Sequence, residues 1–169
     1  MDKTNIRFKY DTLTKIFHWV SAVIILWALF SGFIVFQTIT DESILHLVSE
    51  FNVSITLLLI PIFILRIINR LHKYKYEKEN QHNFAAYLVH AFIYAVTIFI
   101  LISGVLMING DVNIFGMTLF KNTLNSTYTD WFASYHTYAC MLLGGLVLLH
   151  VLAVVKHHLS GYHIMLKMV

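Results

Sequence analysis

Four apolar segments, each long enough to cross a lipid bilayer, constrain this sequence more than any other feature. A membrane-spanning helix needs about 20 predominantly apolar residues. The four segments cover residues 16–36, 44–65, 84–108 and 131–155. They show no strand-like alternation of polar and apolar residues. Because backbone polar groups inside a bilayer must be satisfied within the segment, the sequence predicts four transmembrane helices.

The composition indicates the same class of protein. The chain has 169 residues, of which 58% are hydrophobic and 12% are charged, whereas a soluble domain is usually near half apolar and a quarter charged. This length suits one domain. We therefore predict an all-α, integral membrane four-helix bundle in which residues 1–169 form a single transmembrane domain in membrane lipid. The net charge of +3 comes without a basic stripe of interleaved aromatic residues, so no nucleic acid partner is predicted.

Lysine and arginine residues are distributed unevenly around the four segments. They gather before the first segment, between the second and third, and after the fourth, whereas Lys121 is the one basic residue in the other two connections. The positive-inside rule therefore predicts that both termini and the middle connection are cytoplasmic. The last connection, residues 109–130, contains an Asn-Gly-Asp turn signal and is expected to fold back along the membrane surface. Pro61 is expected to kink the second helix.

Two histidines in the fourth segment pose the main chemical question. His136 and His150 are fourteen residues apart, which is about 3.9 helical turns and about 21 Å, so both point to nearly the same face. A polar side chain inside a membrane is costly unless it has a partner. One interpretation is a pair of core histidines hydrogen-bonded to neighbouring helices. The other is haem ligation, since helix bundles hold such cofactors and paired histidines are a standard axial set.

A second ligand for each haem would come from a facing helix at equal depth. His18, at the cytoplasmic start of the first helix, matches the depth of His150, and the two are predicted to hold an inner haem iron. His136 lies near the outer start of the fourth helix, and His46 lies at the outer start of the second. These two form a candidate pair for an outer haem iron. Alternatively, His46 is an interfacial side chain among lipid headgroups.

Several stretches, in their order and spacing, resemble the bacterial cytochrome b561 family, the four-helix group that includes superoxide oxidase. They are KIFHWVSA, ILRIINRL, YLVHAFIYAVTIFILISGVL and YHTYACMLLGGLVLLHVLAVVKHHL followed by MLKMV, and they cover nearly the whole chain. The resemblance implies b-type haems held between histidines, electron exchange with ubiquinone or another quinone, and a multi-pass location in the bacterial inner membrane. His18, His136 and His150 match ligand positions of the family.

The second helix departs from the family pattern. The ligand position of the family, fourteen residues before Arg66, falls on Asn52, and an asparagine is a poor haem ligand. His46 is six residues earlier, about 9 Å further along a helix, so it replaces the ligand only if the helix shifts or unwinds there. The expected haem count is therefore one or two. The outer haem is shifted, held by His136 alone, or absent.

Four further residues are candidates for binding quinone or the haem propionates. By the resemblance, His157 matches a position at the quinone end and His90 matches a recurring histidine of the third helix. His90 either hydrogen-bonds a propionate or a helix neighbour, or ligates the inner haem in place of His18. Arg66 either pairs with propionates, whose carboxylates match its fork, or is an ordinary cytoplasmic-side residue. Trp19 either walls the inner haem or belongs to the interfacial aromatic belt.

Three functions remain open from the sequence. The first is a membrane b-type cytochrome that transfers electrons between an outer-surface donor and the quinone pool; the resemblance implies superoxide as the donor, which would make the chain an oxidoreductase rather than only an electron carrier. The second is a membrane anchor subunit that passes electrons from a partner dehydrogenase or hydrogenase. The third is a haem-free, histidine-rich bundle that binds or transports a metal ion. No motif for hydrolytic chemistry or nucleotide binding appears.

Overall fold

The computed structural model describes residues 11–77 and 84–160 of the chain, with side chains described for 11–72 and 87–160. The predicted N-terminal segment, part of the middle connection and the C-terminal tail lie outside the described residues. Several of the basic residues on which the predicted cytoplasmic placement of the termini depends are among them. The assignment of each end of the bundle to a side of the membrane therefore remains a prediction.

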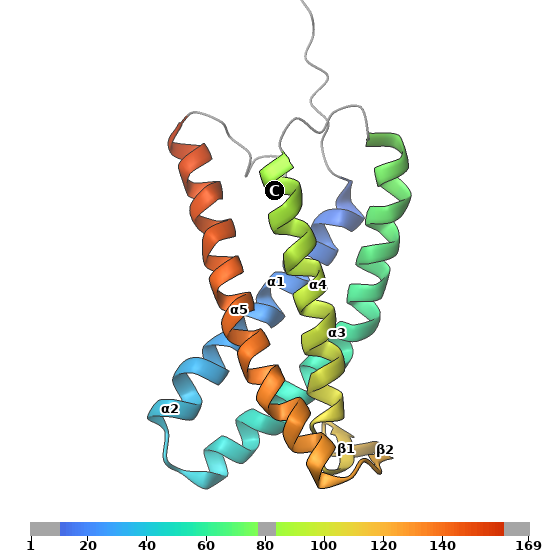
Figure 1. Cartoon of the computed structure of the whole chain (residues 1–169), viewed down its shortest axis with the longest axis vertical. Helices are drawn as coiled ribbons and strands as arrows, with labels where there is room; N and C mark the ends of the chain where they lie inside the picture. The colour runs from blue at the N-terminus through green and yellow to red at the C-terminus, as the bar shows by residue number, and fades with distance from the viewer. Residues whose placement is uncertain (1–10, 78–83, 161–169) are drawn as a thin grey trace, which may run out of the picture.

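Within the described residues, four long helices pack together and confirm the predicted all-α bundle. The elements are α1 (Thr12–Phe30), which continues through the π-helix η1 (Ser31–Val35) into α2 (Phe36–Thr38), then α3 (Glu42–Glu77), α4 (Phe84–Leu106) and α5 (Ser126–Leu159). Each of the four contains a stretch long and apolar enough to span a bilayer. The helices alternate in direction, so the start of α1 and the end of α5 lie at the same end of the bundle (Figure 1).

Two helices extend beyond their predicted membrane segments. α3 has 36 residues and contains Pro61 without ending there, since a transmembrane helix tolerates proline when neighbouring groups satisfy the freed backbone. α5 begins at Ser126, where the side chain of Asn125 accepts a hydrogen bond from the backbone N–H of Thr127 at 3.0 Å. This contact is a regular N-cap, which satisfies one of the free backbone donors of the first turn.

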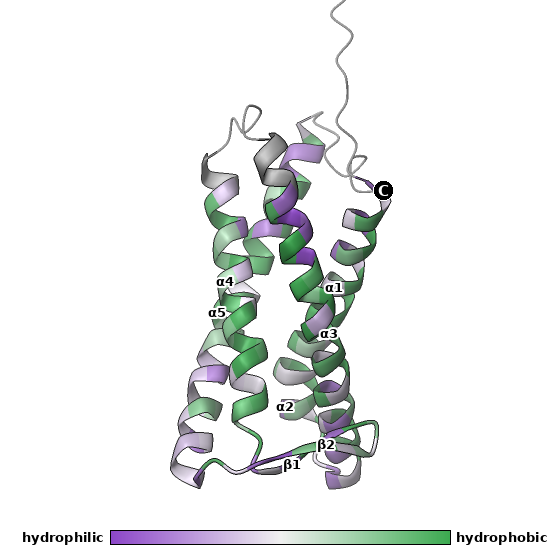
Figure 2. Ribbon diagram, turned by 90° about the vertical axis from the view of Figure 1, so that its right-hand side faces the viewer, coloured by the Kyte–Doolittle hydropathy of each residue, from purple (hydrophilic) through white to green (hydrophobic). Residues whose placement is uncertain are grey.

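The helices pack as two pairs. α4 lies closely along α5 and α1 lies closely along α3, while α3 and α4 contact each other more sparsely. Figure 2 shows the α4–α5 pair beside the α1–α3 pair, with hydrophobic residues along the middle of the helices. A small apolar cluster joins the pairs, with Leu59 and Phe63 from α3 and Leu101 from α4. A ligand between the pairs would therefore be reached by side chains from both.

The interior is rich in small hydroxyl side chains, as is common where transmembrane helices approach each other closely. The buried polar residues are Ser21, Ser31, Ser54, Thr97, Ser103 and Thr129. Several donate to a carbonyl of their own helix, as Ser21 Oγ does to Phe17 O at 2.7 Å and Thr97 Oγ1 does to Ile93 O at 2.7 Å. Large apolar side chains cover the outside instead. This distribution is the one expected of a protein whose solvent is lipid.

An antiparallel hairpin, β1 (Gly110–Ile114) and β2 (Met117–Asn122), joins α4 to α5 at the end of the bundle opposite the start of α1 (Figure 1). The sequence did not predict these strands. The chain reverses at Phe115 and Gly116, with φ of 46° and 80°, and two positive φ values are typical of a tight hairpin turn that matches the strand twist. The predicted Asn-Gly-Asp signal instead marks the entry to β1.

The hairpin is attached to the bundle by buried contacts. Val112 is fully buried, and the backbone N–H of Phe115 donates to Ser54 Oγ of α3 at 2.8 Å. Asn122 Nδ2 donates to the carbonyls of Leu106 and Ile108 at the end of α4, at 3.2 and 2.7 Å. The hairpin is thus fixed to α3 and α4 and closes this end of the bundle.

Candidate functional site

Three helices bring histidines together near the end of the bundle where α1 starts and α5 ends. His18 of α1, His90 of α4 and His150 of α5 are each half-buried. The rings of His90 and His150 are 5.1 Å apart between centroids and meet edge to face at 77°. Arg66 of α3 donates from Nη2 to His18 Nδ1 at 3.0 Å, and His90 and His150 lie close enough to interact electrostatically with His18. We call these four residues the histidine cluster.

Arg66 is held firmly within this cluster. Its Nε donates to the hydroxyl of Tyr94 at 3.0 Å. Its guanidinium lies over the rings of Tyr94 and Phe63, at 5.2 and 5.9 Å from the centroids, and Arg70 lies over Tyr94 at 4.8 Å. Because a guanidinium matches carboxylates and stacks on aromatic faces, this arrangement fixes positive charge beside the imidazoles. It suits a ligand that carries carboxylates.

His136 is directed toward α4, far from the histidine cluster. Its Nδ1 lies 3.0 Å from Ser103 Oγ, which itself donates to Ile100 O at 3.3 Å, and the Ile100 carbonyl lies close enough to the ring to affect it electrostatically. When Ser103 donates to Ile100 O, its oxygen is left to accept from His136, and in that tautomer Nδ1 carries the proton and Nε2 keeps its lone pair. A Cβ on Gly104 would come within 3.2 Å of His136 Cε1. Glycine there leaves room for the ring.

The contacts of α4 with α5 fall at two depths. His90 touches His150, and fourteen residues further along α4, Gly104 touches His136. His136 and His150 are also fourteen residues apart. A step of fourteen residues is about 21 Å and returns to nearly the same helix face. The histidine cluster and the surroundings of His136 are therefore two levels of one interior face, about 21 Å apart.

α3 repeats the same spacing. Arg66 lies at the level of His18 and close enough to His150 for the two to interact electrostatically. Asn52 is fourteen residues earlier in α3. Because α3 and α5 run in the same direction, equal steps place Asn52 at the depth of His136. The asparagine that occupies the predicted ligand position is thus level with the histidine that it would face.

The side chain of Asn52 is partly engaged with α1. Its Nδ2 donates to Ser31 Oγ at 2.7 Å, and Ser31 donates to Ala28 O at 3.1 Å. Asn52 Oδ1 and Trp27 Nε1 are buried, and neither has a hydrogen-bond partner within the described part of the chain. The Trp27 ring meets Phe51 edge to face at 5.7 Å. An acceptor and a donor without partners therefore lie on the α1–α3 pair at this level.

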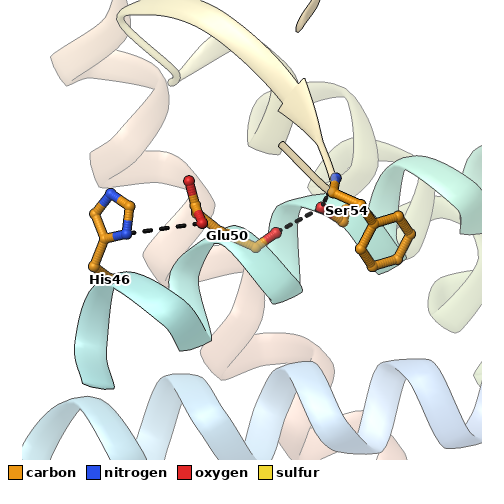
Figure 3. Close-up of polar contacts among 4 residues, drawn as sticks. His46, Glu50 and Ser54 are labelled. Atoms are coloured by element: carbon orange, nitrogen blue, oxygen red, sulfur yellow. Dashed lines mark hydrogen bonds and ion pairs between the residues drawn. The ribbon is translucent and has the colours of Figure 1, made fainter. Parts of the chain in front are cut away.

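His46 lies apart from Asn52. Its side chain is 75% exposed, and its Nδ1 lies 3.8 Å from Glu50 Oε2. Figure 3 shows His46 and Glu50 one turn apart on α3, followed by Ser54, which holds the hairpin. Six residues separate His46 from Asn52, a rotation that leaves it about 120° around the helix. The contact that the structure gives His46 is with Glu50 on the surface of the same helix. Ligation of the outer iron by His46 stays a prediction.

Two further predicted residues lie beside the histidine cluster. Trp19 is 47% exposed and meets His18 edge to face at 5.6 Å, so it covers one side of that imidazole. His157 is half-buried and seven residues beyond His150 on α5, which places it on nearly the same face about 10 Å nearer the helix end. Both positions are compatible with their predicted roles.

Tyr94 and Ser103 were not identified from the sequence, although both contact the proposed site residues. A signal for Ser103 was present, because it directly precedes Gly104, which stands fourteen residues after His90, the same spacing as in α5. Tyr94 follows His90 by one turn, on the same side of α4. Applying the fourteen-residue step to α4 as well would have located Ser103 beside the second level.

The donor set limits what this interior can bind. Among the described residues, no group of three or more His, Cys, Asp or Glu is placed to hold a metal ion. A porphyrin supplies the equatorial donors itself and needs only axial ligands from the protein. Imidazoles at two levels, with arginine beside one of them, therefore suit haem better than a bare ion.

The histidine cluster and the surroundings of His136 differ in how well they suit a haem. An iron-binding histidine usually donates its other ring N–H to a neighbouring acceptor, which is the arrangement of His136. At His18, the guanidinium of Arg66 has no acceptor, so Nδ1 accepts and Nε2 carries the proton. For His18 Nε2 to bind iron, Arg66 must release Nδ1 and the proton must move there.

A family model described as prokaryotic cytochrome b561 matches residues 9–169. The match spans both levels of the interior and all four long helices. No curated protein matches the chain.

Proposed function

Since this chain belongs to the prokaryotic cytochrome b561 family and is a multi-pass bacterial membrane b-type cytochrome of electron transfer, we propose that it carries electrons between an outer donor and membrane quinone. Haem b supplies an iron that takes up and releases one electron at a time. The observation that carries the proposal is the histidine cluster, in which imidazoles from both helix pairs meet beside a fixed arginine.

His18 and His150 are the proposed axial ligands at this level. They come from opposite helix pairs, whereas His90 comes from the same pair as His150. Arg66 would pair with a propionate of the bound haem, because an arginine–carboxylate pair is a strong charge-assisted contact. Tyr94 would hold the guanidinium in place for that contact. His90 would hydrogen-bond a propionate or orient the ring of His150.

Quinone is the proposed partner at the end where α5 finishes. Lys15, Arg66, Arg70 and Lys156 lie toward this end, and Lys121 lies in the hairpin at the other, so the positive-inside rule assigns the quinone end to the cytoplasmic face of the inner membrane. His157 is the group proposed to exchange protons with quinone, since an imidazole both gives and takes a proton near neutral pH.

Superoxide is the proposed donor at the hairpin end. Two superoxide anions each lose one electron and become dioxygen, and one quinone takes the two electrons with two protons to become quinol. No other reactant is needed. In this role the chain is an oxidoreductase, and the hairpin end is the face at which the donor arrives.

The test uses the full-length protein purified in detergent. A pyridine haemochrome assay gives haem per polypeptide, and anaerobic addition of a quinol follows the reduction of that haem. We expect haem that quinol reduces, and a loss of about one haem in His150→Ala but not in His158→Ala, whose side chain is exposed. Protein without haem contradicts the proposal. Haem that quinol reduces, with no quinone-dependent consumption of superoxide, contradicts the donor alone.

A further inference from the structure

We propose that a haem at the second level has His136 as its single protein ligand and keeps an open iron position, facing Asn52 and Trp27, that binds a diatomic gas. This rests on the haem binding proposed above but concerns a different level, different residues and a different chemistry. An iron with two imidazole ligands passes electrons without binding a substrate. An iron with one imidazole ligand can bind a small molecule directly.

The contacts of His136 position its ring to bind iron. Its Nδ1 lies 3.0 Å from Ser103 Oγ of α4, and the Ile100 carbonyl lies beside the ring as a second possible acceptor. Its ring lies so close to Gly104 that a methyl group there would crowd it. These contacts fix the ring and its tautomer and leave Nε2 to bind iron, as the neighbours of metal-binding histidines generally do.

The opposite side offers no second imidazole at that depth among the described residues. α3 presents Asn52, whose amide nitrogen is bonded to Ser31. His18, His90 and His150 belong to the histidine cluster, about 21 Å away. His46 lies about 120° around α3 from Asn52 and beside Glu50 at the surface. The sixth iron position therefore lacks a strong protein ligand.

The second observation is a pair of polar atoms without partners on the α1–α3 pair at this level. Buried polar groups are almost always hydrogen-bonded, yet Trp27 Nε1 and Asn52 Oδ1 both lack a partner within the described residues. A diatomic ligand on iron accepts a hydrogen bond, which the indole N–H of Trp27 can donate. The π-helix η1 begins at Ser31, which is four residues after Trp27 and accepts the hydrogen bond of Asn52, and π-helical turns are frequent at functional sites.

The test uses carbon monoxide as the probe. We expect the dithionite-reduced, full-length protein to bind about one carbon monoxide per polypeptide, and the ferric protein to show a high-spin EPR signal beside the low-spin one. His136→Ala removes both the carbon monoxide adduct and the high-spin signal. Asn52→His supplies the missing imidazole, so it converts the high-spin signal to low-spin and abolishes carbon monoxide binding at unchanged haem content. His46→Ala is the matched control and changes neither signal.

Three results overturn this proposal. One is a wild-type protein whose haem is entirely low-spin and does not bind carbon monoxide. Another is a high-spin signal that appears only in His46→Ala, which would make His46 the ligand. The third is unchanged haem content in His136→Ala. None of them removes a low-spin, quinol-reducible haem at the histidine cluster, so failure here is distinct from failure of the proposed function. If Asn52→His does not fold, the wild-type EPR spectrum decides.

Discussion

Ser103 offers the sharpest single perturbation of the second level, because it is 1% exposed and its hydroxyl lies 3.0 Å from His136 Nδ1. Ser103→Ala removes that acceptor without changing the backbone. Loss of such a supporting contact typically lowers metal affinity by about 10–100-fold, which is about 1.4–2.7 kcal/mol. The Ile100 carbonyl lies beside the ring and remains in the variant as an alternative acceptor. We therefore expect an effect at the lower end of this range, which is about tenfold weaker haem binding.

The assay is the rate of haem transfer from the protein to an excess of an apo-haem acceptor protein. The haem of the second level is the part of the bound haem that the wild-type protein holds and His136→Ala lacks. Ser134→Ala is the matched control, since Ser134 is two residues from His136, is exposed, and donates only to Asp130 O at 3.0 Å. We expect that fraction to leave about tenfold faster in Ser103→Ala and unchanged in Ser134→Ala. Equal rates in the two variants would refute the assigned role of Ser103.

Three further changes test other parts of the site. Arg66→Met should reduce the preference for haem over its dimethyl ester by about tenfold or more, because a hydrogen bond to a charged group contributes about 1.5–3 kcal/mol; competition between the two porphyrins measures it. Gly104→Val should displace the ring of His136, which would lie 3.2 Å from the new Cβ, and cost about one haem per polypeptide. Asn122→Ala should lower the free energy of hairpin opening by about 1.5–4.5 kcal/mol, since it loses the hydrogen bonds to Leu106 O and Ile108 O and the one that Leu124 N–H donates to Oδ1, at about 0.5–1.5 kcal/mol each; hydrogen exchange of the hairpin amides measures it.

Each of these variants has a control in the same chain. Arg66→Lys keeps the charge but loses the fork, so part of the ester discrimination should remain. Gly145→Ala adds a Cβ with nothing within 4 Å and should keep its haem. Thr118→Val removes a hydroxyl that donates to Asn113 Oδ1 in the same hairpin, and should leave the attachment to α4 intact. If a control substitution had the same effect as the variant it is paired with, the physical reason given for that variant would be contradicted.

The fold was predictable because length and apolarity are properties of whole segments. Residues 84–108 predicted a helix that the structure gives as Phe84–Leu106. The extensions of α3 and α5 beyond the membrane were not predicted, since their residues are polar and leave the apolar pattern. The start of α5 had a local signal in Asn125, a typical N-cap residue. The hairpin was missed because its strands are short and its turn, Phe115-Gly116, is not among the strongest turn signals.

The site was predictable to the extent that it follows helical spacing. Depth alone placed His18 and His150 at the same end, and the structure brings Arg66 and His90 to them. Depth alone could not show that His46 faces Glu50 at the surface, because rotation about the helix axis depends on packing. Nor could it show that Arg66 donates to His18, which is a property of two side chains that meet from different helices.

The most direct test of the account is the low-spin ferric EPR signal of full-length protein in His18→Ala and in His90→Ala. If His18 and His150 hold the iron from opposite helix pairs, His18→Ala removes the signal of the bis-imidazole haem and His90→Ala retains it. A signal that persists in His18→Ala and disappears in His90→Ala would place both ligands on the α4–α5 pair and contradict the account.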